Sequence, residues 1–265
     1  FGRPEVLVPI VVGGLSLIVF VARQLRLQRS DNPLLDLRVF RFPMFSLSVG
    51  LFMIAMLALF GSMILLPIYL QNVRGFDTLQ TGLFLLPGGA LMGLAAPFVG
   101  RLFDRVGPVP MTTIGASLIA LMLWRFSTIG ADTPVPLLLG LHLLLSSGMA
   151  LLFTPLMTTG MNPLPPRLYS HGSAVMSTLQ QVGGAMGVAL LVTVMTSRAG
   201  ALGTSVAPEV AMAAGLRTAF AVGAGFAVVA AVLTVFLRRV EPEEGEARAE
   251  AGVPIEVDEL AVPAH

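Results

Sequence analysis

Seven long apolar runs constrain the fold of this chain more than any other feature. They cover approximately residues 5–22, 44–70, 80–100, 109–127, 135–158, 174–196 and 217–237. A helix that crosses a bilayer needs about 20 predominantly apolar residues, whereas the strands of a membrane barrel alternate between apolar and polar. The chain is 55% hydrophobic and 12% charged, and a soluble domain carries about 25% charged residues. We therefore predict an all-α, polytopic membrane protein with seven transmembrane helices.

The residue types in the sequence exclude several kinds of chemistry. There is no cysteine, which excludes disulfides, thiolate metal sites and cysteine nucleophiles. All sixteen basic residues are arginine, so no lysine is present to form a Schiff base, as a covalently bound retinal requires. The apolar runs contain no paired acids and no nucleophile beside a base. We therefore predict no enzyme, no cofactor and no metal site, and no nucleic-acid partner because the arginines are spread along the chain.

The arginines are divided unevenly between the two ends of the predicted helices. If the first helix runs from the outside to the inside, eleven arginines lie on the inner side and five on the outer side. Membrane proteins carry an excess of basic residues in their cytoplasmic loops. We expect a multi-pass protein of the plasma membrane with a cytoplasmic C-terminus. Tyr69 and Trp124 then fall at the outer interface, where aromatic residues anchor membrane helices.

Composition divides the chain into three parts. Residues 1–43 hold the first apolar run and an arginine-rich linker, which we expect on the cytoplasmic side. Residues 44–238 hold the other six runs and predict a six-helix transmembrane bundle. The last part, 239–265, is rich in acidic residues, which predicts a disordered cytoplasmic tail. The first residue is not methionine, and we expect the chain to be one portion of a longer membrane protein.

Three charged residues follow the third apolar run directly. Arg101, Asp104 and Arg105 precede Gly107, and we expect them in a short inner loop where Gly107 ends a helix and the chain reverses. The two arginines favour the negative end of that helix, whereas a carboxylate there is unfavourable without a partner. Two interpretations remain open. The residues form either an anchor with a local Asp–Arg pair, or a charge relay that latches one helix to another in one conformation.

The residues 100–107, GRLFDRVG, resemble the G-x-L-a-D-R-x-G signature of the major facilitator superfamily. In that family the signature joins the second and third helices of a six-helix half, and here it follows the second of six runs. The strings at 32–45, 66–89 and 168–191 are similar to the fourteen-span drug:proton antiporters of the same superfamily. The resemblance implies that the last six helices form one six-helix half of a major facilitator fold. Residues 5–22 would then be an extra central helix, and the N-terminal half would lie outside this chain.

The resemblance also implies a function. The chain would be the C-terminal half of a proton-coupled exporter that moves small lipophilic molecules, antibiotics among them, across the lipid bilayer by alternating access. Gly100, Asp104, Arg105 and Gly107 would form its gating loop. No Asp or Glu lies in the middle of any run, so the coupling carboxylates are expected in the missing half. The alternative is a complete seven-helix membrane sensor or receptor with an outer N-terminus.

Few polar or adaptable side chains within the runs suit a transport pathway. His142, Gln180 and Gln181 are candidates because intramembrane polar groups are rare and often functional. The alternative for each is a hydrogen bond to a neighbouring helix. Met56 and Phe60 are candidates because methionine-rich surfaces adapt to varied ligands, although helix packing explains them equally well.

Two pairs of small residues predict close helix packing. Gly89 and Gly93 form one G-x-x-x-G motif, and Gly183 and Gly187 form another. Such motifs let the backbones of two membrane helices approach each other. Near the start of the sixth run, a serine beside His171 is expected to cap the incoming helix, with no chemistry for the histidine itself.

Overall fold

The computed structural model describes residues 4–28, 34–203 and 205–237. Within these ranges the chain is helical and has no strand, which confirms the all-α prediction. The elements, in chain order, are α1 (Pro4–Leu27), η2 (Leu37–Arg41), α2 (Pro43–Asn72), α3 (Thr78–Val106), α4 (Pro108–Phe126), α5 (Val135–Met161), η3 (Pro166–Leu168), α6 (Tyr169–Leu202) and α7 (Pro208–Thr234).

Six of the described helices, α2 to α7, are long and apolar enough to cross a membrane. They correspond to the last six predicted runs. The first run forms α1, and its crossing of the membrane stays a prediction. The expected acidic tail at 239–265 lies outside the described residues.

The helices are longer than the apolar runs that predicted them. The sixth run ends at 196, but α6 continues to Leu202, and α7 begins at Pro208 instead of 217. The third helix, α3, continues to Val106, so Arg101, Asp104 and Arg105 are helical and do not lie in a loop. The expected inner loop is reduced to one residue, Gly107, between α3 and α4. The reason is physical: hydropathy marks the part of a helix that suits hydrocarbon, whereas the backbone hydrogen bonds continue into the polar ends.

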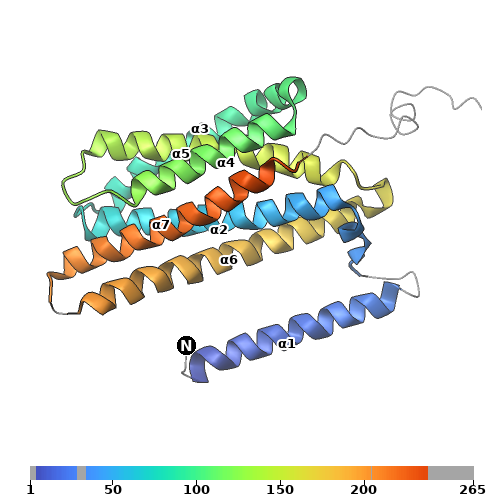
Figure 1. Cartoon of the computed structure of the whole chain (residues 1–265), viewed down its shortest axis with the longest axis horizontal. Coiled ribbons are helices and arrows are strands. Elements are labelled where there is room, and N and C mark those ends of the chain that lie inside the picture. Colours follow the sequence, from blue (N-terminus) through green and yellow to red (C-terminus); the bar gives the residue numbers. More distant parts are fainter. Residues whose placement is uncertain (1–3, 29–33, 204, 238–265) are drawn as a thin grey trace, which may run out of the picture.

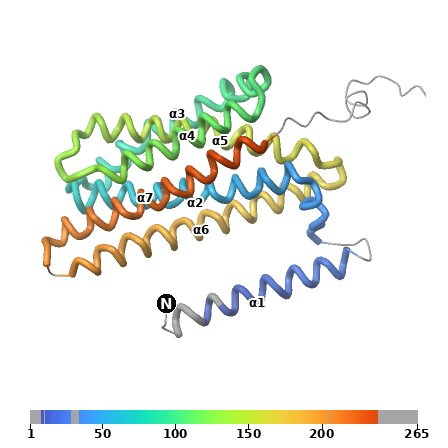
Figure 2. Tube along the Cα trace, viewed as in Figure 1, coloured from blue at the N-terminus to red at the C-terminus, as the bar shows by residue number. Residues whose placement is uncertain are grey.

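The six helices form an up-and-down bundle. Figure 1 shows the α2–α3, α4–α5 and α6–α7 connections at one end, and η2, the α3–α4 turn and the α5–α6 connection at the other. Helix α1 is drawn apart from this bundle in Figure 2, and its side chains from Val11 to Arg23 are exposed.

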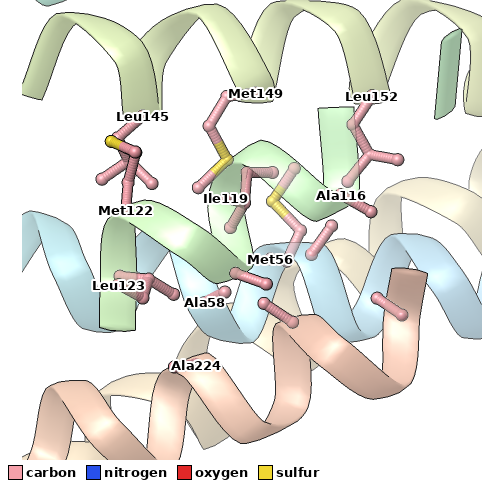
Figure 3. Packing of buried hydrophobic residues seen from close by; sticks show 14 of the residues in the cluster. Met56, Ala58, Ala116, Ile119, Met122, Leu123, Leu145, Met149, Leu152 and Ala224 are labelled. Carbon is pink, nitrogen blue, oxygen red and sulfur yellow. The ribbon is translucent and has the colours of Figure 1, made fainter. Parts of the chain in front are cut away.

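The core lies between α2, α4, α5 and α7. Helix α2 contacts α5, α6 and α7, and α4 contacts α5 and α7. Figure 3 shows Met56, Ile119, Met149 and Ala224 meeting there from four helices. In contrast, α3 and α6 are little buried: in the apolar 18-residue stretch of each helix only 17% is buried, whereas in α2 the value is 61%. These two helices therefore leave most of their surface for lipid or for protein outside the described chain.

Glycines allow two close helix crossings. A Cβ on Gly115 of α4 would lie 2.8 Å from the backbone oxygen of Gly148 on α5, and a Cβ on Gly148 would lie 2.9 Å from the oxygen of Gly115. A Cβ on Gly183 of α6 would lie 2.8 Å from the oxygen of Met53 on α2, and Gly187 meets the backbone of Leu57. These crossings hold α5 against α4 and α6 against α2.

Candidate functional site

A cavity of about 180 Å³ lies between α2, α3 and α5. Its walls are mostly apolar and include three methionines, and the polar groups are one histidine and two serines. The lining residues are Leu59, Ser62, Met63, Leu66, Leu85, Gly89, Met92, His142, Leu145, Ser146 and Met149. A concave, mainly apolar site with few polar groups is the usual form of a small-molecule pocket.

Gly88 lets α3 approach α5 beside this cavity. A Cβ at this position would lie 2.6 Å from the Ser146 hydroxyl oxygen and 2.8 Å from Cδ2 of His142. Any larger residue would therefore displace one of these side chains. The next residue, Gly89, faces the cavity, and a Cβ there would meet no atom within 4 Å.

His142 has one hydrogen-bonding atom without a partner in the described part of the chain. Its Nε2 lies 3.3 Å from the carbonyl oxygen of Leu85. A carbonyl can only accept, so Nε2 carries the proton and donates. Nδ1 is buried and has no partner among the described residues. In the neutral imidazole this second nitrogen is an acceptor. His142 therefore brings a buried, unpaired acceptor to the ring that lines the cavity.

The other polar and adaptable side chains complete the site. The Ser62 hydroxyl donates to the carbonyl oxygen of Ala58 at 2.7 Å, which leaves its oxygen able to accept. Met63, Met92 and Met149 come from three different helices, and unbranched thioether side chains repack readily around varied shapes. The site suits a small apolar group with one donor.

The predicted pathway residues do not all meet in this cavity. His142 lines it, but Met56 does not: it is 3% exposed and points into the core towards α4 (Figure 3). Phe60 packs against α6, where a Cβ on Gly184 would touch its ring. On α6, Gln180 is half-buried and Gln181 is exposed, and neither lines the cavity. The roles of the two glutamines in a pathway remain predictions.

Sequence reasoning missed the serines and two of the methionines in the cavity. One signal was available, because His142 and Ser146 are four residues apart and so share one face of α5. The methionines Met63 and Met92 carry no such signal. The sequence of a uniformly apolar helix does not indicate which of its methionines lines a cavity.

The first glycine motif does not act between the described helices. A Cβ on Gly89 or Gly93 would meet no atom within 4 Å, whereas Gly88 holds the close approach to α5. One residue along a helix is a rotation of about 100°, so the motif and the contact lie on different faces of α3.

The charged end of α3 is an exposed helical turn. Asp104 and Arg105 are both exposed, and within the described ranges Asp104 forms neither an ion pair nor a hydrogen bond, so the local Asp–Arg pair is absent. Gly107 has φ of +83° and its N–H donates to the oxygen of Phe103 at 2.9 Å. Helix α4 begins at the next residue, which makes Gly107 the whole connection. Gly100 lies one turn before Asp104, and its Cβ position is open.

His171 holds the α1–α2 linker to α6. The backbone N–H of Asp36 donates to Nδ1 of His171 at 3.2 Å, and the Asp36 carboxylate accepts from Gln28 and from the Arg38 N–H. The prediction of a serine cap was wrong. The N-cap of α6 is Leu168, which makes no side-chain capping bond, and the helix starts from η3 without one.

Tyr69 is not an interface anchor. It is 1% exposed, and its hydroxyl donates to the oxygen of Gly130 in the α4–α5 connection at 2.6 Å. The sequence places Tyr69 at the correct end of the molecule. Its ring, however, points into the bundle, and its hydroxyl links the end of α2 to the α4–α5 connection. Trp124, by contrast, is 59% exposed at the same end.

Comparison with known proteins supports one family. The family model of the Major Facilitator Superfamily matches residues 6–188. The lincomycin resistance protein LmrB of Listeria innocua is 39% identical over 247 residues, which cover 91% of this chain and 52% of that protein. The uncharacterized MFS-type transporter YhcA of Bacillus subtilis is 43% identical over 195 residues, 74% of this chain and 36% of that protein.

A third relative extends the range of organisms. The multidrug resistance protein B homolog of Mycobacterium tuberculosis is 33% identical over 194 residues, which cover 72% of this chain and 36% of that protein. The chain thus spans about half the length, or less, of these curated relatives.

Proposed function

The chain belongs to the major facilitator superfamily, and from that membership we propose that it forms the C-terminal half of a multi-pass membrane exporter. The exporter moves small lipophilic molecules outward in exchange for protons, by alternating access of two bundles around a site near the middle of the membrane. The names of the relatives support drugs as the substrates, since two of the three refer to lincomycin or multidrug resistance. None of the three is named as a sensor or receptor.

The half-protein assignment is supported by the helix count and by length. Six helices, α2 to α7, form the bundle, which is the size of one half of a major facilitator. The chain also spans 52% of LmrB. Helix α1 then belongs to the extra central pair of a fourteen-span protein, and the missing half covers the exposed faces of α3 and α6.

The proposed orientation places the α3–α4 turn in the cytoplasm. At that end the described arginines are Arg23, Arg26, Arg38, Arg41, Arg101, Arg105 and Arg167. At the other end they are Arg74, Arg125, Arg198 and Arg217. This division agrees with the excess of basic residues on the inner side of membranes.

One observation carries the assignment of a substrate subsite: the cavity between α2, α3 and α5 is lined by methionines and by His142, whose buried Nδ1 has no partner among the described residues. Apolar walls take the lipophilic part of a substrate, and Nδ1 of His142 accepts from its donor group. A buried acceptor without a partner costs about 1–3 kcal/mol, and a ligand that supplies the missing bond recovers part of that cost. His142 therefore orients substrate in this proposal.

Proton coupling comes from outside the described bundle. The acids within the described helices α2 to α7 are Asp104 and Glu209, and both lie at helix ends. Intramembrane carboxylates are the usual proton carriers of transporters. We assign them to the other half. The inner turn formed by Gly100, Asp104, Arg105 and Gly107 acts as the gate, with the exposed Asp104 carboxylate meeting a group of that half when the inner side closes.

The test is export by cells that express the full-length gene, with and without an uncoupler of the proton gradient. A fluorescent lipophilic dye and lincomycin serve as probes. Export that an uncoupler abolishes supports a proton-driven exporter. Accumulation that is equal in expressing and non-expressing cells for every probe contradicts it.

A matched pair of substitutions tests the cavity. Gly89→Leu fills it without a backbone clash, because a Cβ there has no neighbour within 4 Å. Ala90→Leu adds a similar volume to the adjacent exposed position, which does not line the cavity. Gly89→Leu should reduce export and Ala90→Leu should not, at equal protein level. Equal export by the two variants would exclude the cavity as a substrate subsite.

A further inference from the structure

A second hollow runs along the outside of the bundle between α4 and α7. The two helices are in contact along their length (Figure 1). The hollow has a volume of about 740 Å³ and is lined on the α7 side by small or short residues, among them Ala221, Gly225 and Val228. Ser117, Ala120, Leu121 and Trp124 form the α4 side. We call it the α4–α7 groove.

The groove has the length of a lipid chain. Its lining extends along α7 from Ala221 to Val235, which is about 21 Å at 1.5 Å per residue. One leaflet of a bilayer has a hydrocarbon thickness of about 15 Å. The lining is almost entirely apolar, so water does not stabilise the groove. An acyl chain that lies at a slant fits these dimensions.

A cationic hollow adjoins the groove at one end. It has a volume of about 440 Å³ and contains Arg198 and Arg217 beside Ser127 and Thr218. Trp124 and Ala221 line both hollows, so the two hollows adjoin each other there. The exposed indole of Trp124 marks this end as the level of the membrane interface, where tryptophan is enriched.

The two arginines have donors to offer. Nε of Arg217 donates to the carbonyl oxygen of Ser127 at 3.0 Å, which orients the guanidinium and leaves its other four N–H groups. Neither Arg198 nor Arg217 forms an ion pair with a described carboxylate. Both arginines line the same hollow, and the planar fork of arginine matches the oxygens of a phosphate.

We propose that the α4–α7 groove and its cationic end form a binding site for one anionic phospholipid. An acyl chain lies between α4 and α7, and Arg198 and Arg217 hold the phosphate at the interface. The apolar groove without the arginines would accept any lipid, and the arginines without the groove would accept any anion. Because the two hollows adjoin, they select a molecule that has both parts. This site requires that α4 and α7 cross a membrane, and it does not depend on export.

The experiment measures lipid binding to the purified full-length protein in a mild detergent by native mass spectrometry. The probes are phosphatidylglycerol, phosphatidylcholine with the same acyl chains, and glycerol phosphate without chains. We expect phosphatidylglycerol to bind at least tenfold more tightly than either of the others, because phosphatidylcholine has the same phosphate but also a choline cation, which Arg198 and Arg217 repel, and glycerol phosphate has no chain for the groove. Equal binding of the two lipids would overturn the charge assignment. If glycerol phosphate binds as tightly as phosphatidylglycerol, the groove does not hold an acyl chain, and that part of the proposal is overturned.

Two variants with matched controls locate the site. Arg198→Gln, which breaks no hydrogen bond within the described chain, should weaken phosphatidylglycerol binding about fivefold, the effect of one basic residue near a membrane surface. Arg125→Gln, an exposed arginine at the same end, is the control. Gly225→Leu should obstruct the groove without a clash, and Gly50→Leu, an equally open helical position on α2, should not. Unchanged binding in Arg198→Gln and Gly225→Leu, or equal loss in the controls, would overturn the proposal.

Discussion

The crossing of α2 and α6 provides the sharpest test of how this bundle is held together. Gly187 of α6 faces the backbone of α2, and a Cβ on it would lie 2.6 Å from the Cα of Leu57 and 2.9 Å from its carbonyl carbon. Two carbons in contact need about 3.5–4.0 Å. Gly187→Ala therefore requires the two helices to separate by about 1 Å. No rotamer change relieves the clash, because both atoms belong to the backbone.

The size of the effect follows from two opposing terms. A separation of 0.5–1 Å forfeits about a quarter to a half of the dispersion energy of the affected contacts, and overpacking in a filled interior costs about 1–3 kcal/mol. Replacing a helical glycine by alanine gains about 1 kcal/mol. The expected net loss is up to about 2 kcal/mol. Gly50→Ala, an exposed helical glycine of α2 with no atom within 4 Å of its Cβ, has only the favourable term.

The assay is thermal unfolding of the purified full-length protein in detergent, followed by loss of the monodisperse peak in size-exclusion chromatography. A loss of about 2 kcal/mol lowers the midpoint by about 4–8 °C in a domain of this size. Gly50→Ala should leave the midpoint unchanged or raise it. If Gly187→Ala unfolds at the same temperature as Gly50→Ala or higher, the close crossing of α2 and α6 is refuted.

Three further predictions concern the two ends of the bundle. Tyr69→Phe removes the buried bond to the Gly130 oxygen and should destabilise the protein by about 1–3 kcal/mol; the same thermal assay checks it, and an unchanged midpoint would contradict it. His171→Ala removes the acceptor for the Asp36 amide, and hydrogen exchange of that amide should become faster, whereas an unchanged rate would mean that the linker is held elsewhere. Asp104→Asn should reduce uncoupler-sensitive export at equal protein level, and full export would reduce the inner turn to an anchor.

The sequence predicts the helices of this chain well, because burying a backbone in hydrocarbon leaves the helix as almost the only solution for a long apolar run. The class of the protein and six of the runs follow from that single constraint. It does not predict where each helix ends. The ends of α3 and α6 extend beyond the apolar runs, since charged and polar residues at the interface cost little.

The site was predicted only in part, because membrane helices have weak directional signals. In a soluble helix the polar face shows which side is buried, but α2 and α5 are apolar all round. His142 could be named because it is ionisable. Met56 could not be distinguished from Met63, although one lies in the core and the other lines the cavity.

The exposed surface of α3 connects the glycine pattern with the proposed second half. Gly82, Gly89, Gly93 and Gly100 are spaced by seven, four and seven residues, so they share one face of α3, and a Cβ on any of them would meet no atom within 4 Å. The exposed Leu94 lies on another face, whereas the exposed Leu86 lies on the glycine face between Gly82 and Gly89. Lipid chains gain nothing from a row of glycines, whereas a second helix gains close backbone contact. Since no described helix covers this face, the exporter proposal assigns the part of it outside the cavity that Gly89 lines to a helix of the missing half.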